Sequence, residues 1–384
     1  MLNENTLRTI AENEPQWLID NRLSSMKKFK ELSLPKFKYG IGILVDTSEL
    51  NLNINPLLKN ETVIVADESV RISRLHDALE NHGELIREII TKQPNDNKIN
   101  ALHNTFFNDF MLIHIPKNTK IEKPIQINNK INDCLIRHIL IIAEDNSEAI
   151  ITEHTISAAN NQTFCSQFVN VIVKENAKLK YNIAQGLNTN AYNFLTRKAN
   201  VGRNGKITWM TCSIGSKFNQ SSTKTNLIAE GAESKTFNVA FGDREQCYDL
   251  NEENNHIASN TLSSLLAKLI LNDKARIVFR GLVKINNKAE GCEGSQKEES
   301  ILLSENARVD IVPNLEISNN NVKCNHGATI SQIDEETLFY LMSRGIHENM
   351  AKKLIIEGIF DTFISKVDDE NLKKEIKEAI AGRL

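Results

Sequence analysis

The sequence lacks the long apolar runs, basic clusters and close cysteine pairs that mark several classes of protein. No window approaches the roughly 18 consecutive apolar residues of a membrane-spanning helix. The N-terminal stretch MLNENTLRTIAENEPQWLID has neither the basic nor the apolar region of a secretory signal. The six cysteines are widely spaced, so in a reducing compartment we expect thiols and no disulfide framework. Together these absences predict a cytoplasmic protein without membrane contact.

Motifs for nucleotide and nucleic-acid chemistry are also missing. The formal net charge is −3, and no stripe of Lys and Arg is interleaved with aromatics, which argues against nucleic acid as a partner. The chain has no GxxxxGKS or GxxxxGKT loop, no strand–GxGxxG–helix unit, and no GxSxG, HExxH or CxxC motif. The sequence therefore offers no Walker-type ATP site, no dinucleotide site and no self-contained zinc site.

The sequence predicts an N-terminal region of helices and mixed secondary structure, which we assign to residues 1–100. Over residues 3–33, apolar side chains recur at helical spacing with charges between them, and Pro15 suits the start of a helix. Residues 71–90 are amphipathic in the same way, with Gly83 as an interruption. We expect helices in both stretches.

From about residue 101 to 333 the sequence predicts a β-solenoid. Short apolar runs follow polar turns that end in a small residue. These small residues are Ala149, Ala177, Gly205, Ala232, Ala275 and Ala307, at intervals of 28, 28, 27, 43 and 32 residues. A near-constant period in this range indicates stacked repeats. We expect the 43-residue interval to contain an insertion at residues 243–255. A β-sandwich is the alternative, since it also has short strands and frequent turns.

Residues 334–384 predict a C-terminal helical domain. Asp334 is a candidate N-cap and Gly345 a candidate left-handed stop, and a second helix follows. The tail DDENLKKEIKEAIAGRL predicts a third helix. The broad apolar surface of this domain has two explanations: it packs on the solenoid and blocks its open edge, or it docks another chain.

The stretch VKCNHGAT, residues 322–329, holds the strongest candidate for a functional site. Cys324 and His326 are two residues apart, so in an extended strand both project to the same side. Both residue types bind metals, but two ligands are too few for a structural zinc site. The pair is either a buried cysteine beside a hydrogen-bonded core histidine, or half of a metal site whose other ligands come from elsewhere in the chain or from another subunit. We expect Cys292 in an exposed loop, and Glu298 and Glu299 in solvent.

The segment around this pair resembles the C-terminal signature of the SufB/SufD family of iron–sulfur cluster assembly proteins. The matching residues are Leu303, Glu305, Ala307, Val309, Pro313, Leu315, Glu316 and Ile317, then VKCNHGAT, then DEETLFYLMSRGI at 334–346. The stretch EPQWL at 14–18 is similar as well. The resemblance implies a mainly β fold, with a right-handed parallel β-helix core flanked by N-terminal and C-terminal α-helical regions.

Three departures favour the SufD type over the SufB type within this family. The SufB type carries a functional cysteine where this chain has Glu298 or Glu299, and it reads EHEA where this chain reads CNHGA. The chain is also short for the SufB type and lacks a cysteine-rich N-terminal segment.

For function, the resemblance implies a scaffold subunit of the SufBCD complex that is not an enzyme. It implies a heterodimer with SufB through the β-helix region, and a homodimer is conceivable when the chain is isolated. His326 and Cys324 would contribute to a transient iron or iron–sulfur cluster shared with SufB, and the chain alone would bind no cofactor stably. The C-terminal helices would dock the SufC ATPase. The docking residues expected there are Phe339, Tyr340, Arg344, Gly345, Leu354, Gly358 and Phe360.

Two other functions remain open at this stage. The first is a SufB-like scaffold that works as a homodimer. The second is a β-solenoid enzyme acting on polysaccharide. The low aromatic content of 6% and the missing secretory signal argue against the enzyme.

Overall fold

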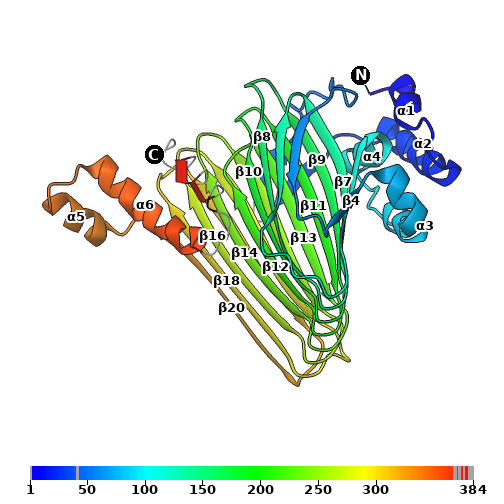
Figure 1. The fold of residues 1–384 in the computed structure, drawn as a ribbon. Coiled ribbons are helices and arrows are strands. Elements are labelled where there is room, and N and C mark those ends of the chain that lie inside the picture. Colours follow the sequence, from blue (N-terminus) through cyan, green and yellow to red (C-terminus); the bar gives the residue numbers. More distant parts are fainter. Residues whose placement is uncertain (1, 40–42, 366–369, 371–372, 375–376, 379–384) are drawn as a thin grey trace.

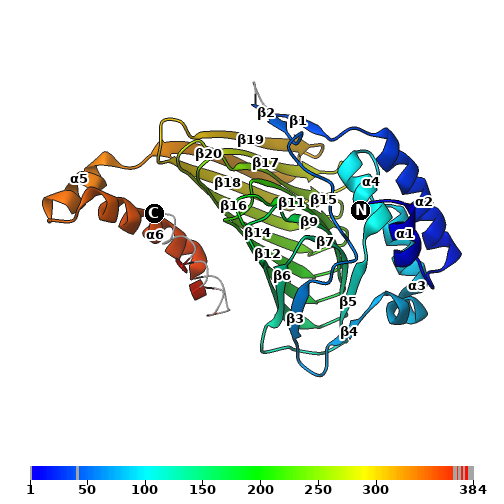
Figure 2. The same cartoon turned by 90° about the horizontal axis from the view of Figure 1, so that it is seen from above.

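The protein is a parallel β-solenoid of about eight turns with helices on two sides (Figure 1). The computed structural model describes residues 2–39, 43–365, 370, 373–374 and 377–378. Two nine-stranded sheets face each other across the interior (Figure 2). From β5 onward, odd-numbered and even-numbered strands alternate between the sheets, so each turn of the chain adds one strand to each sheet.

The strands of the first sheet, called sheet 1 here, are given in spatial order. They are β20 (Val322–Gln332), β18 (Cys292–Leu302), β16 (Leu262–Leu271), β14 (Glu233–Gly242), β12 (Lys206–Ser213), β10 (Lys178–Gly186), β8 (Glu148–Ser157), β6 (Ile125–Ile131) and β3 (Glu61–Val65). Sheet 2 consists of β19 (Arg308–Ile317), β17 (Arg276–Ile285), β15 (Cys247–His256), β13 (Phe218–Leu227), β11 (Tyr192–Val201), β9 (Phe164–Val173), β7 (Cys134–Ala143), β5 (Asp109–Ile115) and β4 (Arg71–Ser73). A separate hairpin joins β1 (Lys36–Tyr39) to β2 (Ile43–Asp46).

Parallel pairing decides between the two folds that the sequence left open. Every pair from β5 onward is parallel, and only β3 and β4 join their sheets in antiparallel fashion. A sandwich would pair its strands antiparallel. The solenoid prediction is confirmed. Its interior is packed with the inward-facing apolar residues of both sheets, such as Ile139, Ile151 and Leu179.

The repeated polar turns fold the chain at one edge of the solenoid. Asn118, Asn146, Asn176 and Asn204 take left-handed backbone conformations with φ between 49° and 58°. Asparagine tolerates this conformation better than most residues. The side chains also stack, because Nδ2 of Asn176 donates to Oδ1 of Asn146 at 3.0 Å, and Asn146 donates to Asn118 at 2.8 Å. This ladder accounts for part of the asparagine content of the chain.

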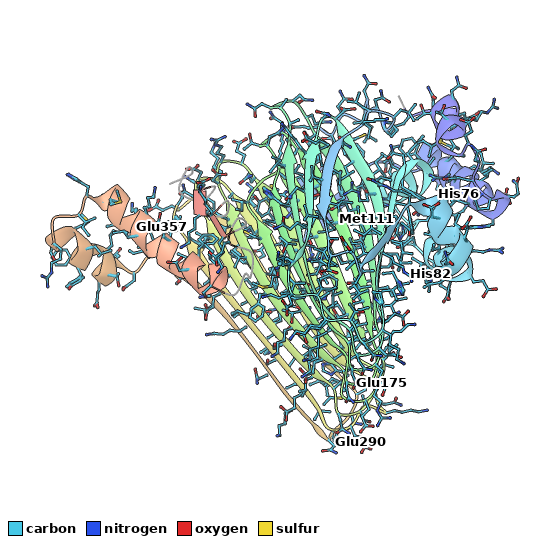
Figure 3. All side chains as sticks on the ribbon, in the orientation of Figure 1. His76, His82, Met111, Glu175, Glu290 and Glu357 are labelled. Carbon is cyan, nitrogen blue, oxygen red and sulfur yellow. The ribbon has the colours of Figure 1, made fainter. Side chains whose placement is uncertain are left out.

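The prediction of an insertion at residues 243–255 is wrong. Most of that segment is strand β15, which pairs in register with β13 and β17. The long interval arises because similar small residues precede strands of both sheets. Ala232 precedes β14 of sheet 1, whereas Ala275 precedes β17 of sheet 2, so the interval measures one and a half turns. Figure 3 labels Glu175 and Glu290 in two of the turns from sheet 2 to sheet 1, at one edge of the solenoid.

The N-terminal helices cover the outer face of sheet 2 at one end of the solenoid (Figure 2). They are α1 (Glu4–Ile10), α2 (Gln16–Glu31), α3 (Leu75–Thr91) and α4 (Lys98–Phe106). Pro15 precedes α2 at the N-cap, as expected. The stretch 71–90 holds the short strand β4 before α3. Helix α4 was not predicted; its N-cap is Asn97, whose side chain accepts from the backbone N–H groups of Ile99 and Asn100.

The C-terminal helices lie on the other side of the solenoid, where α6 packs against sheet 1 and α5 projects away from it (Figures 1 and 2). They are α5 (Glu335–Ser343) and α6 (Glu348–Ile364). The side chain of Asp334 accepts from the backbone N–H of Thr337, and Gly345 has a φ of +85°, so both predicted ends of α5 are confirmed. The tail for which a third helix was predicted lies mostly outside the described residues. No helix in the described part of the chain is both long and apolar enough to cross a bilayer.

Helix α6 packs on the side of the solenoid and not on its open edge. Ile356, Phe360 and Ile364 contact a cluster on β12 and β14 that includes Met210 and Phe241. Figure 3 labels Glu357 on this helix, on the side of the molecule opposite to His76 and His82 of α3. Of the alternative that the helical domain packs on the solenoid and blocks its open edge, the packing is confirmed and the blocking is wrong for the described residues.

Candidate functional site

The candidate site lies at an open end of the solenoid. Strands β19 and β20 are the last of their sheets, and each pairs on one edge only among the described residues. Apolar side chains are exposed on both strands: Ile317 is 42% exposed and Ile330 is 53% exposed. Unpaired strand edges of this length readily form hydrogen bonds with a strand of another chain, and proteins usually cover or interrupt such edges. This end of the solenoid is therefore a place where another chain could add.

Cys324 and His326 both project to the inner side of this last turn. In parallel pairing, Cys324 lies beside Gly294 and His326 beside Gln296. Gly294 and Gln296 are buried inside the solenoid, whereas Glu293 and Lys297, on either side of this pair, are exposed. Paired residues of neighbouring strands face the same side of the sheet. The predicted common orientation of Cys324 and His326 is therefore confirmed.

The two side chains differ in burial. Cys324 is half-buried and packs against a buried cluster that includes Val283 and Cys292, and this burial raises the pKa of its thiol. His326 is exposed, since no further turn covers it, and it forms no hydrogen bond or ion pair with the described residues. The alternative that His326 is a buried histidine whose ring nitrogens are hydrogen-bonded within the core is therefore wrong. Its imidazole is free to bind a group at the open end.

The donor types fit iron, but their number falls short of a complete site. Imidazole and thiolate are donors that iron and iron–sulfur clusters accept. In the parts of the chain that the structure describes, no three His, Cys, Asp or Glu side chains lie close enough to hold an ion together. Cys324 and His326 therefore provide an incomplete donor set, in agreement with the expectation from their spacing.

Glu298 is a functional candidate that the sequence did not reveal. It was expected in solvent, but it is fully buried inside β18 and neither carboxylate oxygen has a hydrogen-bond partner. Burial raises the pKa of this carboxyl from 4.5 to about 7. Glu299 faces outward and pairs with Lys297 at 2.5 Å and with Lys268 at 3.4 Å. The alternation of a strand starting at Cys292 is the signal that could have separated the two glutamates.

Cys292 was expected in an exposed loop, and this expectation is wrong. It is the first residue of β18 and is fully buried. Its sulfur lies 3.2 Å from the hydroxyl of Thr261, which in turn lies 2.8 Å from Nδ1 of His256. The structure thus places Cys292 in the packed interior, where oxidants and metals in solvent do not reach it.

The C-terminal helices place most of the predicted docking residues on the surface. Helix α5 buries none of its described residues, and Phe339 and Tyr340 are 73% and 55% exposed. The guanidinium of Arg344 lies 5.2 Å from the ring centre of Tyr340. Gly345, Leu354 and Gly358 are exposed as well.

Phe360 is the exception among the predicted docking residues. It is 1% exposed, and its ring centre lies 6.2 Å from that of Phe241 on β14. Because α6 presents this side chain to the solenoid, Phe360 anchors the helix and does not face a partner.

The buried carboxyl of Glu298 is expected to make stability depend on pH. Because its pKa is about 7 in the folded chain and near 4.5 in the unfolded chain, the folded state binds more protons between these values. The free energy of unfolding therefore falls as the pH rises from 4.5 through 7. Glu298→Gln should remove this loss and raise the free energy of unfolding by about 3 kcal/mol above pH 7, with no gain at acid pH. Urea unfolding at both pH values, with a chelator present, measures the difference.

Glu299→Gln is the matched control, because Glu299 is ion-paired on the outer face of the same strand. This variant should show no increase in the free energy of unfolding above neutral pH. A gain for Glu298→Gln that is the same at acid and alkaline pH would contradict the assignment of a buried carboxyl.

Two models of known protein families match this chain, and together they cover residues 48–359. Residues 126–359 match the family described as "SUF system FeS cluster assembly, SufBD core domain". Residues 48–127 match the family described as "SufBD protein N-terminal region". The core match alone spans more than half of the chain and includes the solenoid strands from β7 to β20, with Cys324 and His326.

Several curated proteins are similar over nearly their whole length. An iron–sulfur cluster assembly SufBD family protein of Staphylococcus saprophyticus is 26% identical, and the alignment covers 96% of this chain and 90% of that protein. Proteins of the same description from Staphylococcus epidermidis and Staphylococcus aureus are also 26% identical, with the same coverage.

Proposed function

The chain belongs to the SufBD family of iron–sulfur cluster assembly proteins, and on this basis we propose that it is a non-catalytic scaffold subunit of the SufD type in a cytoplasmic SufBCD complex. The observation that carries the proposal is the pair Cys324 and His326. Both project to the inner side of an uncovered last turn, and His326 has no partner among the described residues. Such a pair is suited to share a site with a second chain.

The second chain in this proposal is a SufB-type member of the family. Its own solenoid would add to the exposed edges of β19 and β20, which offer backbone donors and acceptors and the apolar side chains of Ile317 and Ile330. The added chain would supply the ligands that this chain lacks. Iron and sulfide are the cargo of such a site, and His326 and Cys324 would hold them only while the cluster is built.

The partner of the C-terminal helices in this proposal is the SufC ATPase. Helix α5 exposes Phe339 and Tyr340 on a short two-helix unit that contacts the solenoid through α6. Exposed neighbouring aromatics of this kind are enriched at the centres of protein interfaces. No nucleic acid and no membrane belongs to the proposal.

A SufB-like homodimeric scaffold is the second candidate. The exposed edges that could accept a paralogue could also accept a second copy of this chain. A glutamate, Glu298 or Glu299, at the expected place of the SufB-type cysteine favours the SufD type, because a copy of this chain would bring no thiol there. Size-exclusion chromatography with light scattering, on the chain alone and with a SufB-type partner, separates the two candidates.

The edge itself can be tested with Ile330→Lys. A lysine at this exposed position would have to be desolvated in the joined solenoid, so we expect affinity for the SufB-type chain to fall at least about tenfold. Ile228→Lys is the matched control, because Ile228 is 48% exposed in a turn far from the open end. Equal affinities of wild type and Ile330→Lys, measured by titration calorimetry, would exclude this edge as the interface.

A further inference from the structure

The face of α3 that packs on sheet 2 contains a histidine. Ala78, Ile86 and Ile90 of this helix are buried in the apolar cluster that joins the N-terminal helices to sheet 2. His82, labelled in Figure 3, lies four residues after Ala78 and four before Ile86, so it shares their face of the helix. It is only partly buried, whereas Ala78 and Ile86 are 1% and 0% exposed. A titratable side chain thus interrupts an otherwise apolar contact.

The helix itself is interrupted at the same residue. The backbone of His82 has φ −134° and ψ 24°, which lies outside the helical region, so α3 consists of two helical pieces that meet there. Gly83 follows, and a Cβ atom built on it would meet nothing within 4 Å. The first piece, residues 75–81, can therefore move relative to the second without disturbing a side-chain contact at the break.

Four titratable or charged groups of the solenoid surround His82. Its ring centre lies 5.5 Å from that of His114 on β5. Nε2 of His114 lies 3.2 Å from Oε1 of Glu144, and Oε2 of the same carboxylate lies 2.7 Å from Nζ of Lys174. Arg71 of β4 is paired with His114 in the register of the sheet and is exposed. Of these four groups, Glu144 alone is acidic.

The charges of α3 itself do not compensate for a charge on His82. Glu80 and Glu84 are exposed, and each lies two residues from His82, a spacing at which helical side chains do not face each other. His76 and Asp77 lie at the exposed start of the helix, with 3.7 Å between Nδ1 and Oδ1. The solenoid side of the contact therefore decides whether a charged His82 is tolerated.

Protonation of the two histidines upsets the balance of charge at this contact. While both imidazoles are neutral, the charges of Glu144 and Lys174 offset each other. Protonation of His82 and His114 adds two positive charges next to this single carboxylate. Burial lowers the pKa of His82, and His114 and Lys174 lower it further, while Glu144 raises it. The docked helix therefore favours the neutral form of His82, and protonation opposes docking.

We propose that His82 and His114 form a latch, which holds the first piece of α3 on sheet 2 at neutral pH and releases it in mildly acidic solution. The sign follows from linkage: a histidine that is neutral when docked contributes stability above its ordinary pKa of 6.5, and this contribution is lost as the pH falls below that value. Release would uncover apolar residues of sheet 2 such as Leu112 of β5. The latch lies at the end of sheet 2 opposite to β19, so it is separate from the site at the open end.

Hydrogen exchange of the full-length protein, followed by mass spectrometry with a chelator present, tests the latch. Rates at about pH 7.5 and about pH 5.5, on either side of the ordinary histidine pKa, are corrected for the intrinsic effect of pH with an unstructured peptide. Protection of residues 75–81 should fall at least about tenfold at the lower pH, whereas α2 should keep its protection. His82→Leu should keep the protection of residues 75–81 at both pH values, because leucine suits the apolar face and does not titrate.

His76→Leu is the matched control, because His76 is an exposed histidine of the same helix. This variant should lose protection at the lower pH as the wild type does. His114→Gln, which removes the facing imidazole, should reduce the loss. An equal loss in wild type and His82→Leu overturns the proposal, and so does wild-type protection that is independent of pH. Simultaneous loss of protection in all segments would indicate global acid unfolding and would also contradict a local latch.

Discussion

Replacing His326 with alanine is expected to abolish cluster assembly while the complex still forms. The imidazole is exposed on the last strand and contacts no described residue through a hydrogen bond or ion pair, so its loss should change the free energy of unfolding by no more than about 0.5 kcal/mol. Among the described residues, His326 is the one unoccupied imidazole donor on the inner side of the open end, and the substitution removes it. Iron and acid-labile sulfide per complex should therefore fall at least about tenfold.

Asn325→Ala is the matched control for this experiment. Asn325 lies on the same strand, but its side chain faces the other side of the sheet. Its replacement should leave the iron and sulfide content at the wild-type level. A well-folded His326→Ala complex with a normal cluster yield would contradict the proposed role of the histidine.

The double substitution Phe339→Ser with Tyr340→Ser is expected to remove binding of the ATPase partner. Both rings lie exposed on α5, which buries no described residue, so the change leaves the packing of α6 on the solenoid intact. Aromatic side chains at the centre of an interface contribute about 2 kcal/mol or more each, so the loss of both should reduce affinity roughly a thousandfold. Titration calorimetry with the purified ATPase measures the loss.

Leu57→Ser with Leu58→Ser provides a matched pair of exposed apolar residues at the other end of the chain. Each is 45% exposed. This double variant should bind the ATPase as the wild type does. If α5 is not the docking element, the Phe339 and Tyr340 variant will capture the ATPase undiminished.

The solenoid could be predicted from the sequence because its turns have local causes. Several turns combine a left-handed residue with a small buried one that follows it, as in Asn176 with Ala177 and Asn204 with Gly205. The error at residues 243–255 came from the same regularity. Both sheets begin strands after small residues, and only the pairing of β15 shows which sheet a strand joins.

The site could be predicted only in part. The spacing of Cys324 and His326 fixed their common orientation, since that depends on the strand alone. The burial of Glu298 depends on where β18 begins and on the turn of the solenoid that covers it. The residues adjacent to Glu298 in the sequence determine neither. The same limit applies to Phe360. Its burial against Phe241 depends on how α6 packs on a sheet more than 100 residues earlier in the chain.

The central claim is that this chain provides half of a site that a different family member completes. Native mass spectrometry of the anaerobically purified complex, with iron and sulfide assayed in the same sample, tests it most directly. We predict an assembly that contains this chain, a SufB-type chain and the ATPase, with iron and sulfide present only when both family members are present. A homodimer of this chain that carries the full iron and sulfide content without a second family member would contradict the account.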